Sequence, residues 1–452
     1  MAKLIKLKRG LDIPFSGKAK EVLGGTLISK EVALIPDYYH GITPKVVVKE
    51  GDVVKIGTPV FYDKKNETMK FVSPVSGKVT AVNRGERRKV LSVVIENDEK
   101  NTTEKFNVGN TEKLSADEVK DILLSSGYWT YIKQRPYDVI ANPAQAPKAI
   151  FISTFDTAPA APDYSFVIGN QIADFQKGVD MLAKLTSGKV NLGVKNGDTL
   201  FSSVKNAEIT AFQGAHPAGN VGIQINNVNP VNKGEVVWTI NAQDVLKIGK
   251  LFATGTPDFT RIVALTGPEV VEPKYYVTVT GGSIEQIIGG KLNTSKNLRC
   301  ISGNVLSGIQ VTGKDYLDPY SNQITVIEEG SEIHELFGWA MPRFNKFSVS
   351  GTYFTGILKL FGKKDFKYDT RLLGGKRAII MSNEYDKVLP MDILPEFLIK
   401  AMITGNIDKM EALGAYEIAP EDLALCEFVC TSKLPIQQIT RTALDNLRKE
   451  LE

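Results

Sequence analysis

The stretch Lys49-Glu-Gly-Asp-Val-Val-Lys-Ile-Gly57, followed by Ser73-Pro-Val-Ser-Gly-Lys-Val79, places glycine, proline and charged turn residues between short runs of valine. Similar β-type runs recur on both sides of it, at residues 46–48, 53–54, 59–61, 69–72, 77–82 and 91–95. Short strands separated by regular turns are typical of a small barrel or sandwich. We therefore expect a β domain over residues 1–100.

The two quoted phrases resemble the barrel-sandwich hybrid fold of lipoyl and biotinyl domains. Such domains carry a modified lysine at the tip of a hairpin. The corresponding segment here, Asp63-Lys-Lys-Asn-Glu-Thr-Met-Lys70, lacks the Asp-Lys-Ala or Met-Lys-Met context of a modified lysine. An unmodified, structural barrel is therefore the favoured interpretation.

Residues 101–256 alternate between strand and helix patterns behind a polar linker at 97–113. Ser115 and Glu118 have the spacing of a capping box at a helix start, and Gly127 is placed to end that helix. Predicted strands lie at 149–152, 166–168, 191–194, 208–212 and 235–240, and predicted helices lie at 172–182 and at 244–251, the latter capped by Asp244. This alternation predicts a Rossmann-like α/β domain.

The remaining residues divide into a second β-rich part and a helical tail. Residues 257–330 combine strands at 275–280 and 324–328 with a short helix at 283–288, which predicts a β-grasp, SLBB-like domain. Residues 331–452 have a mixed and then helical pattern, with helices at 395–403 and 408–413 and a last helix after residue 435. Within the ambiguous part, 331–390, residues 378–381 have the pattern of a strand. The expected whole is an α/β multidomain chain.

Composition bounds the possible partners and compartment. The chain has 452 residues, a net charge of +4 and three cysteines. The basic cluster from Arg84 to Lys89 lies between two predicted strands without interleaved aromatic residues, so we expect no nucleic acid partner. So few cysteines indicate a reducing compartment. No signal-peptide core or apolar run of spanning length is evident, so we expect membrane contact through partners only.

Two of the cysteines, Cys426 and Cys430, lie four residues apart near the end of the chain, and the third, Cys300, is distant in sequence. An iron–sulfur cluster needs four such ligands, and a structural zinc site also needs four. The favoured interpretation is a pair of small residues in a helical core that begins near Pro420. A metal or redox role is the alternative.

A phosphate-binding loop is nearly matched by Gly308-Ile-Gln-Val-Thr-Gly313-Lys314-Asp315. It carries Asp315 where Ser or Thr would bind Mg²⁺, and 309–311 has a strand pattern, so we disfavour this interpretation. No G-x-G-x-x-G fingerprint follows a predicted strand, so a standard dinucleotide site is not expected.

The most distinctive loop is Gly214-Ala-His-Pro-Ala-Gly219-Asn-Val-Gly222, in which glycines allow a ligand to approach the backbone. His216 is a candidate hydrogen-bond donor to a carbonyl such as that of a quinone. Phe212 and Pro217 would shape the loop, and Gly219 would leave room for the ligand. The alternative is a structural turn in which the histidine bonds a neighbouring backbone group.

A second candidate for quinone contact is Pro36-Asp37-Tyr38-Tyr39-His40, where Tyr39 offers a flat aromatic face and His40 a titratable ring. Ordinary packing at a strand end is the favoured alternative. No Ser/His/Asp order, HExxH or carboxylate-pair motif is present, so a hydrolase mechanism is not indicated.

Longer motifs along nearly the whole chain resemble the A-subunit family of the Na⁺-translocating NADH:quinone oxidoreductase (Na⁺-NQR). They are Lys8-Arg-Gly-Leu-Asp-Ile-Pro14, Lys49-Glu-Gly-Asp-Val-Val-Lys55, Val82-Asn-Arg-Gly-Glu-Arg87, Phe155-Asp-Thr-Ala-Pro159, His216-Pro-Ala-Gly219, Val237-Trp-Thr-Ile-Asn-Ala-Gln-Asp-Val245, Ile248-Gly-Lys-Leu-Phe252, Leu389-Pro-Met-Asp-Ile-Leu-Pro395 and Asp422-Leu-Ala-Leu-Cys-Glu-Phe-Val-Cys430. The chain departs from the family at Ile223-Gln-Ile-Asn226, where Thr-His-Ile-His is common, and at Thr431, where proline is common.

The resemblance implies a peripheral subunit on the cytoplasmic face of the bacterial inner membrane, within a six-subunit respiratory complex. That complex passes electrons from NADH to ubiquinone or menaquinone and exports Na⁺. NADH, FAD, FMN, riboflavin and iron–sulfur sites would belong to other subunits, and the region of Cys426 and Cys430 would be a degenerate cluster region. Contact of this chain with quinone is left open. Two other interpretations are a stand-alone small-ligand-binding module without a respiratory role and an NADH-binding flavoprotein.

Overall fold

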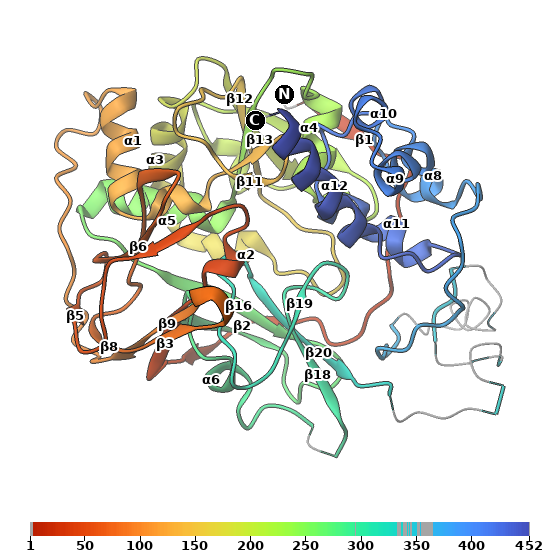
Figure 1. The fold of residues 1–452 in the computed structure, drawn as a ribbon, viewed down its shortest axis with the longest axis horizontal. Coiled ribbons are helices and arrows are strands. Elements are labelled where there is room, and N and C mark those ends of the chain that lie inside the picture. Colours follow the sequence, from red (N-terminus) through yellow and green to blue (C-terminus); the bar gives the residue numbers. More distant parts are fainter. Residues whose placement is uncertain are drawn as a thin grey trace.

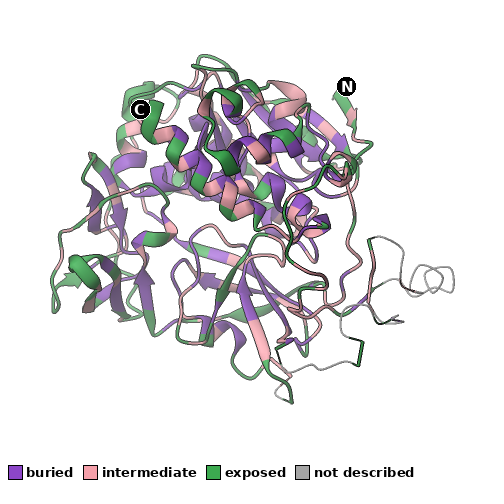
Figure 2. Ribbon diagram, turned by 45° about the vertical axis from the view of Figure 1, so that its right-hand side comes forward, coloured by how far each residue is buried: buried purple, intermediate pink, exposed green. Residues whose placement is uncertain are grey.

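A computed structural model describes residues 3–293, 295–331 and 365–451, together with a few positions between 336 and 353. The chain forms several β layers around a central α/β sheet, with the C-terminal helices on one side (Figure 1). Buried residues line the strands, while the outward faces of the helices are exposed (Figure 2).

The predicted barrel-sandwich hybrid is built from two small sheets. The first has the order β3 (Glu31–Leu34), β9 (Val90–Asn97), β8 (Gly77–Arg84) and β5 (Val53–Val54), and the second has the order β4 (Pro44–Val46), β6 (Pro59–Asp63) and β7 (Asn66–Val72). Alternate residues of each strand point inward. Phe61 and Phe71, which are neighbours on β6 and β7 of the second sheet, stack in the buried core with ring centroids 4.6 Å apart.

The first two strands of the chain leave this domain and join other sheets. β1 (Lys3–Lys6) pairs in parallel with β14 (Glu208–Gln213) of the central sheet. β2 (Lys20–Thr26) pairs in parallel with β17 (Lys274–Val279) of the second β-rich domain. The segment predicted as one β domain, 1–100, therefore contributes strands to all four sheets.

The central sheet has seven strands in the order β1, β14, β13, β12, β15, β10 and β11. Their bounds are Glu208–Gln213 for β14, Lys189–Lys195 for β13, Ala149–Ser153 for β12, Val237–Asn241 for β15, Lys133–Arg135 for β10 and Val139–Ile140 for β11. From β1 to β15 all pairs are parallel. The chain moves outward from β12 through β13 to β14 and then returns to the other side of β12, so the strand order reverses between β12 and β15.

Helices cover both faces of this sheet, as the alternation of side chains along β12 requires. Ile150 and Ile152 face α3 (Ile172–Ala183) and α5 (Ala242–Thr254) in the largest hydrophobic core. The opposite residues of β12 pack in a second core with α4 (Val221–Val228) and the C-terminal helices. α1 (Ala116–Ser125) begins with the predicted capping box, in which Glu118 N donates to Ser115 Oγ and Ser115 N donates to the Glu118 carboxylate.

Two local predictions in this domain are wrong. Residues 166–168 lie in the short helix α2 (Tyr164–Ile168) instead of a strand, because the Asp163 side chain accepts from the backbone N–H groups of Ser165 and Phe166. Asp244 does not cap α5. Asn241 is the N-cap residue, while Asp244 is buried inside the first turn and binds Arg261.

The second β-rich domain has a six-stranded sheet in the order β19, β18, β20, β16, β17 and β2. Its strands are β16 (Thr260–Thr266), β17 (Lys274–Val279), β18 (Leu298–Ser302), β19 (Ile309–Val311) and β20 (Gln323–Glu328), with the helix α6 (Ile284–Ile288) packed on one face. The strand expected at 309–311, within the segment that resembles a phosphate-binding loop, is therefore present as β19.

The C-terminal part is helical, as expected. It contains α8 (Glu384–Val388), α9 (Pro395–Thr404), α10 (Ile407–Ala412), the 3₁₀ turn η7 (Pro420–Leu423), α11 (Ala424–Val429) and α12 (Ile436–Leu451). The strand predicted at 378–381 is not formed; this segment is held by hydrogen bonds with Ser432, which binds the carbonyl of Ala378 and the N–H of Arg377. Most of 332–364, within the segment left ambiguous, lies outside the described residues. No helix in the described part of the chain is long and apolar enough to cross a membrane.

Candidate functional site

A cleft with a volume of about 500 Å³ opens where the strand order of the central sheet reverses. Ser153 at the end of β12 and Asn241 at the end of β15 both line it. Ligands of open α/β sheets bind outside the carboxyl ends of the strands at such a reversal. The cleft volume falls within the range of about 300–1,000 Å³ that is usual for small-ligand pockets.

All parts of the fold contribute to the walls of this switch-point cleft. The barrel domain contributes Tyr38 and His40, and the α/β domain contributes Tyr131, Phe155 and Tyr164. The second β-rich domain contributes residues 302–304, 307–309 and Tyr320, and the C-terminal part contributes Glu421, Gln437 and Arg441. Several aromatic rings therefore stand beside many polar groups. The shape of the cleft depends on how the domains are held together.

Acidic residues outnumber basic residues on the cleft lining. The lining includes six acids, Asp37, Asp138, Asp156, Asp244, Asp318 and Glu421, and three bases, Lys133, Arg135 and Arg441. A negative cleft repels anions and favours neutral or cationic molecules.

One side of the cleft is held by Arg135, which is 2% exposed. Its guanidinium donates to Asp138 Oδ1 at 2.6 Å and to Asp422 Oδ2 at 3.3 Å. Burial raises the pKa of Asp138, but Lys133, Arg135 and Arg441 outweigh it and hold that pKa well below its usual range. Burial raises the pKa of Asp422, against the attraction of Arg135. This buried pair joins the central sheet to the C-terminal helices.

The close approach of Asp422 explains one glycine of the distinctive loop. A Cβ on Gly222 would lie 2.3 Å from both carboxylate oxygens of Asp422. Asp422 thus occupies the N-terminal end of α4, where a negative charge is favourable.

The floor of the cleft is a buried polar network between the α/β domain and the second β-rich domain. Arg261 Nη2 lies 2.5 Å from Asp244 Oδ1, and Arg261 also donates to the side-chain oxygen of Asn322. Gln243 Nε2 donates to the same oxygen at 2.9 Å, and Asn322 Nδ2 donates to Tyr164 Oη at 2.9 Å. The network fixes the two domains relative to each other.

His216 lies in the wall behind the cleft and is not on its lining. It is 4% exposed, and its Nδ1 is 3.1 Å from Thr157 Oγ1. Its backbone N–H donates to Asp12 and its carbonyl accepts from Leu11 N, so the N-terminal segment holds the loop. Burial lowers the pKa of His216, opposed by Asp156 and Asp12. The imidazole is therefore neutral at pH 7.

The other loop residues surround His216. Phe212 is buried in a small cluster with Phe155 and Ala218. Pro217 follows His216 through a cis peptide bond and is buried. Gly219 lines the cleft, and its N–H donates to Thr157 Oγ1 at 2.9 Å. The structure therefore brings Phe212, Gly219 and His216 together but exposes only Gly219 to the cleft.

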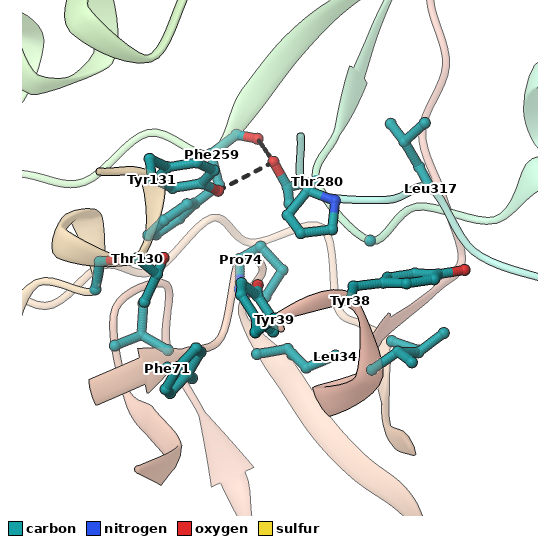
Figure 3. Close-up of a pocket in the computed structure, with 16 residues that line it drawn as sticks. Leu34, Tyr38, Tyr39, Phe71, Pro74, Thr130, Tyr131, Phe259, Thr280 and Leu317 are labelled. Carbon is teal, nitrogen blue, oxygen red and sulfur yellow. Dashed lines mark hydrogen bonds between the residues drawn. The ribbon is translucent and has the colours of Figure 1, made fainter. Parts of the chain in front are cut away.

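Tyr39 lies elsewhere, beside a separate internal cavity between the barrel, η3 (Tyr128–Tyr131) and the second β-rich domain (Figure 3). The cavity has a volume of about 20 Å³, which is the space of one water molecule. Tyr39 packs edge-on against Phe71, with ring centroids 4.7 Å apart, and burial raises its pKa well above the usual value. A quinone ring does not fit there, so the geometry gives no support to Tyr39 as a quinone contact.

His40, the neighbour of Tyr39, is exposed and lines the switch-point cleft. Its Nε2 is 2.8 Å from Asp445 Oδ1 on α12, and Arg441 binds the same carboxylate. Of the six sequence-based candidates, only His40 and Gly219 therefore line the same cavity.

Several residues that line the cleft were missed from the sequence, among them Arg135, Asp156 and Glu421, and so was Asp422, which binds Arg135 behind the lining. Asp156 follows a predicted strand at 149–152, and the rule for strand ends would have identified it. Arg135 and Asp422 are separated by 287 residues, so no local pattern relates them.

The cysteines are packed in hydrophobic cores. Cys426 and Cys430 are each 0% exposed, the first within α11 and the second just after it. Tyr385 Oη is 3.0 Å from Cys430 Sγ, and burial raises the pKa of Cys426. Cys300 lies in a different core. Among the residues that the structure describes, no group of three or more His, Cys, Asp or Glu side chains could hold a metal ion.

Comparison with known families and proteins covers nearly the whole chain. Residues 5–98 match the NqrA N-terminal barrel-sandwich hybrid domain, 114–257 match the NqrA second alpha/beta domain, and 262–313 match the NQRA C-terminal domain. An NAD⁺-reducing NiFe-hydrogenase in the H₂-reduced state covers 74% of this chain and 61% of its own at 8% identity, with a TM-score of 0.38, which is too low to support an inference.

The A-subunit of the Na⁺-translocating NADH-quinone reductase from Haemophilus influenzae is 41% identical over 452 residues, covering 99% of this chain and 100% of the relative. Its counterparts from Pasteurella multocida and Neisseria meningitidis are 40% and 41% identical over 451 residues, again with 99% and 100% coverage. These findings confirm the resemblance and set aside a stand-alone module. The chain therefore belongs to the NqrA family and is a subunit of a Na⁺-translocating NADH-quinone reductase.

Proposed function

We propose that this chain is a peripheral subunit on the cytoplasmic face of the bacterial inner membrane, docked through the other subunits of the six-subunit complex. In this role it supports electron transfer from NADH to ubiquinone or menaquinone, coupled to Na⁺ export, and contacts the quinone ring. It binds no redox cofactor of its own, so that NADH, FAD, FMN, riboflavin and iron–sulfur groups belong to other subunits.

The observation that carries the quinone contact is the switch-point cleft. Its volume of about 500 Å³ suits a substituted ring, and Phe155, Tyr164 and Tyr320 offer aromatic surfaces. Two of the sequence-based candidates, Gly219 and His40, line it. His216 supports the Gly219 loop from behind, through Thr157, which binds both residues. In this geometry His216 reaches a quinone only if the loop opens.

The charge of the cleft supports a quinone over a nucleotide. Acidic side chains outnumber basic ones on the described lining even when Glu421 is not counted, and they repel the phosphates of NADH, FAD or FMN, whereas a quinone is uncharged. The two cysteines near the C-terminus are enclosed by apolar side chains, which supports their role as core residues.

The role in the complex is tested with membranes that lack only this chain. We expect NADH:quinone reductase activity to lose its stimulation by Na⁺ and to regain it when the purified chain is added back. Unchanged activity without the chain, with all other subunits present, would refute the supporting role.

The quinone contact is tested by calorimetric titration of the full chain with ubiquinone-1. Ser307 is exposed and lines the cleft, so Ser307→Trp should fill the cleft and weaken binding at least tenfold. Ser295→Trp, at an exposed position that does not line the cleft, is the matched control. Equal affinity in both variants would place quinone elsewhere. In parallel, unchanged quinone affinity and turnover in His216→Ala would end the donor role of that residue.

A further inference from the structure

We propose that the Glu421 carboxyl group donates a proton to a quinone bound in the switch-point cleft. The inference rests on the proposed quinone contact. It assigns proton transfer to Glu421, whereas the sequence suggested only a hydrogen bond from His216.

Glu421 differs from the other carboxylates on its side of the cleft because its side chain is unpaired. It belongs to η7, where its neighbour Asp422 is buried and binds Arg135, while the Glu421 side chain is exposed on the cleft lining. Asp138 also binds Arg135. Among the described residues, Glu421 forms no side-chain hydrogen bond or ion pair. Its carboxyl is thus free to reach a ligand.

The surroundings of Glu421 favour its protonated form. The side chain meets the solvent of the cleft, but the surrounding walls reduce the hydration of its carboxylate. This desolvation, together with the negative charges of Asp422, Asp156 and Asp138, raises the pKa of Glu421 to about 7. The positive charge of Arg135 opposes this effect. A carboxyl group that titrates near the operating pH is well suited to general acid catalysis.

The cations on the other elements around the cleft are already engaged. Arg135 of β10 is divided between Asp138 and Asp422. Arg441 of α12 binds Asp445 and the backbone carbonyls of Tyr137 and Asp138. Lys133 lies over the ring of Tyr320, 4.3 Å from its centroid.

These groups hold the acidic side of the cleft in place without forming an ion pair with Glu421. Two further buried atoms at this wall, Arg135 Nε and Asp422 Oδ1, have no hydrogen-bond partner among the described residues.

His216 is a poorer donor for two structural reasons. It is 4% exposed behind the loop, and its Nδ1 lies beside Thr157. Burial also lowers its pKa, so it holds no extra proton at pH 7. Glu421 is exposed to the cleft and therefore exchanges protons with water directly.

The proposed step balances with the known reaction of the enzyme. Oxidation of NADH supplies two electrons, which reach the quinone through the complex. As one quinone oxygen gains negative charge, the Glu421 O–H bond breaks and a quinol O–H bond forms. The second proton comes from water in the cleft, and the Glu421 carboxylate regains its proton from the same water.

The test uses the assembled complex with ubiquinone-1 and the variant Glu421→Gln, which keeps the shape but cannot donate an acidic proton. Quinone reduction by the wild type should decline as pH rises through about 7. In the variant it should be about 100-fold slower and lack this pH dependence, consistent with the size of general acid effects. NADH oxidation with ferricyanide, which accepts electrons without protons, should be unchanged.

Glu417→Gln is the matched control, because Glu417 lies close by in sequence but bonds Asn226 and does not line the cleft. Its rate and pH profile should equal those of the wild type. Calorimetry with the full-length chain distinguishes failure of the proposed quinone contact from failure of the proposed proton donation by Glu421. No binding of ubiquinone-1 by the wild-type chain would refute the quinone contact itself.

Two other results would overturn only the proton-donor role. One is normal binding with an unchanged pH profile in Glu421→Gln. The other is loss of binding in that variant while its thermal unfolding midpoint stays that of the wild type, which would make Glu421 a binding residue.

Discussion

Lys247 of α5 is a buried lysine whose removal should stabilise the protein. It is 3% exposed, and its Nζ lies 3.3 Å from Asp244 Oδ1, which already binds Arg261. Two cations therefore share one carboxylate, and Lys247 Nζ makes no hydrogen bond within the described residues. Lys247→Met keeps a long, flexible side chain and leaves the pair of Asp244 and Arg261 intact.

The size of the effect follows from the pKa. Burial and Arg261 lower the pKa of Lys247 from 10.5 to about 7, against the attraction of Asp244. At about 1.4 kcal/mol for each pKa unit, the folded state at pH 7 carries a penalty of about 5 kcal/mol. The pKa of about 7 already includes the attraction to Asp244. Methionine also loses the contact with the Tyr131 ring and must repack the buried site, so we expect a net gain of about 2–4 kcal/mol.

The gain should depend on pH in a defined direction. Between about pH 7 and pH 10, the unfolded chain holds the lysine proton and the folded chain does not. The stability of the wild type therefore rises with pH in this range, by up to about 1.4 kcal/mol per pH unit from this group. Lys247→Met lacks this contribution, so its advantage should be largest at pH 7 and shrink toward pH 10.

Urea denaturation at several pH values measures this difference. Two of the three tryptophans, Trp129 and Trp238, pack against each other at the central sheet, so the change in tryptophan fluorescence includes the unfolding of this domain. Lys250→Met is the matched control, since that lysine is 29% exposed and lies 3.7 Å from Asp258. It should change stability by less than about 1 kcal/mol at every pH. A less stable Lys247→Met, or a gain that does not vary with pH, would refute the argument.

Three further substitutions test the packing around the cleft and α1. Gly222→Ala places a Cβ 2.3 Å from the Asp422 carboxylate and should speed proteolysis of the C-terminal helices. The control Gly375→Ala should not, because the nearest neighbour of its Cβ is a flexible arginine side chain at 3.9 Å. Equal cleavage of the two variants would contradict the close approach of Asp422. Arg135→Met leaves Asp138 and Asp422 without their shared cation and should lower the free energy of unfolding by about 3–5 kcal/mol in urea; a loss below about 1 kcal/mol would show the pair to be dispensable. Ser115→Ala removes the cap of α1 and should cost about 1 kcal/mol in the same assay, while an unchanged midpoint would mean that packing alone fixes this helix start.

Local patterns predicted most elements of the fold because the interactions that form them are local. The capping box joins Ser115 to Glu118, three residues apart, and the alternating runs of the barrel face their partners across short turns. The wrong predictions concern segments whose structure depends on one partner residue that the local pattern did not identify. Residues 166–168 form an apolar run that suits strand or helix, and Asp163 decides for the helix. Asp244 resembles a cap, but its partner Arg261 belongs to another domain.

The candidate site was less predictable, because it is formed between domains. The glycine-rich loop correctly drew attention to the edge of the cleft at Gly219, and the aromatic motif did so at His40. The histidine that made the loop distinctive is instead buried against Thr157 and Asp12. The charged residues that define the cleft carry no local signal, since Arg135 and Asp422 meet only after the whole chain has folded.

The polar contacts that hold the cleft also explain why it keeps one shape. Apolar surfaces can slide past each other at small cost, whereas a buried ion pair loses its partner when it shifts. Arg261 with Asp244 fixes the second β-rich domain to α5, and Arg135 with Asp422 fixes the C-terminal helices to the sheet. Asp244 follows the carboxyl end of β15 by three residues, and Arg135 lines the wall of the same cleft. We infer that Asp244 and Asp422 first serve to join the domains, and that Glu421, which has no side-chain partner among the described residues, is the carboxyl available for chemistry.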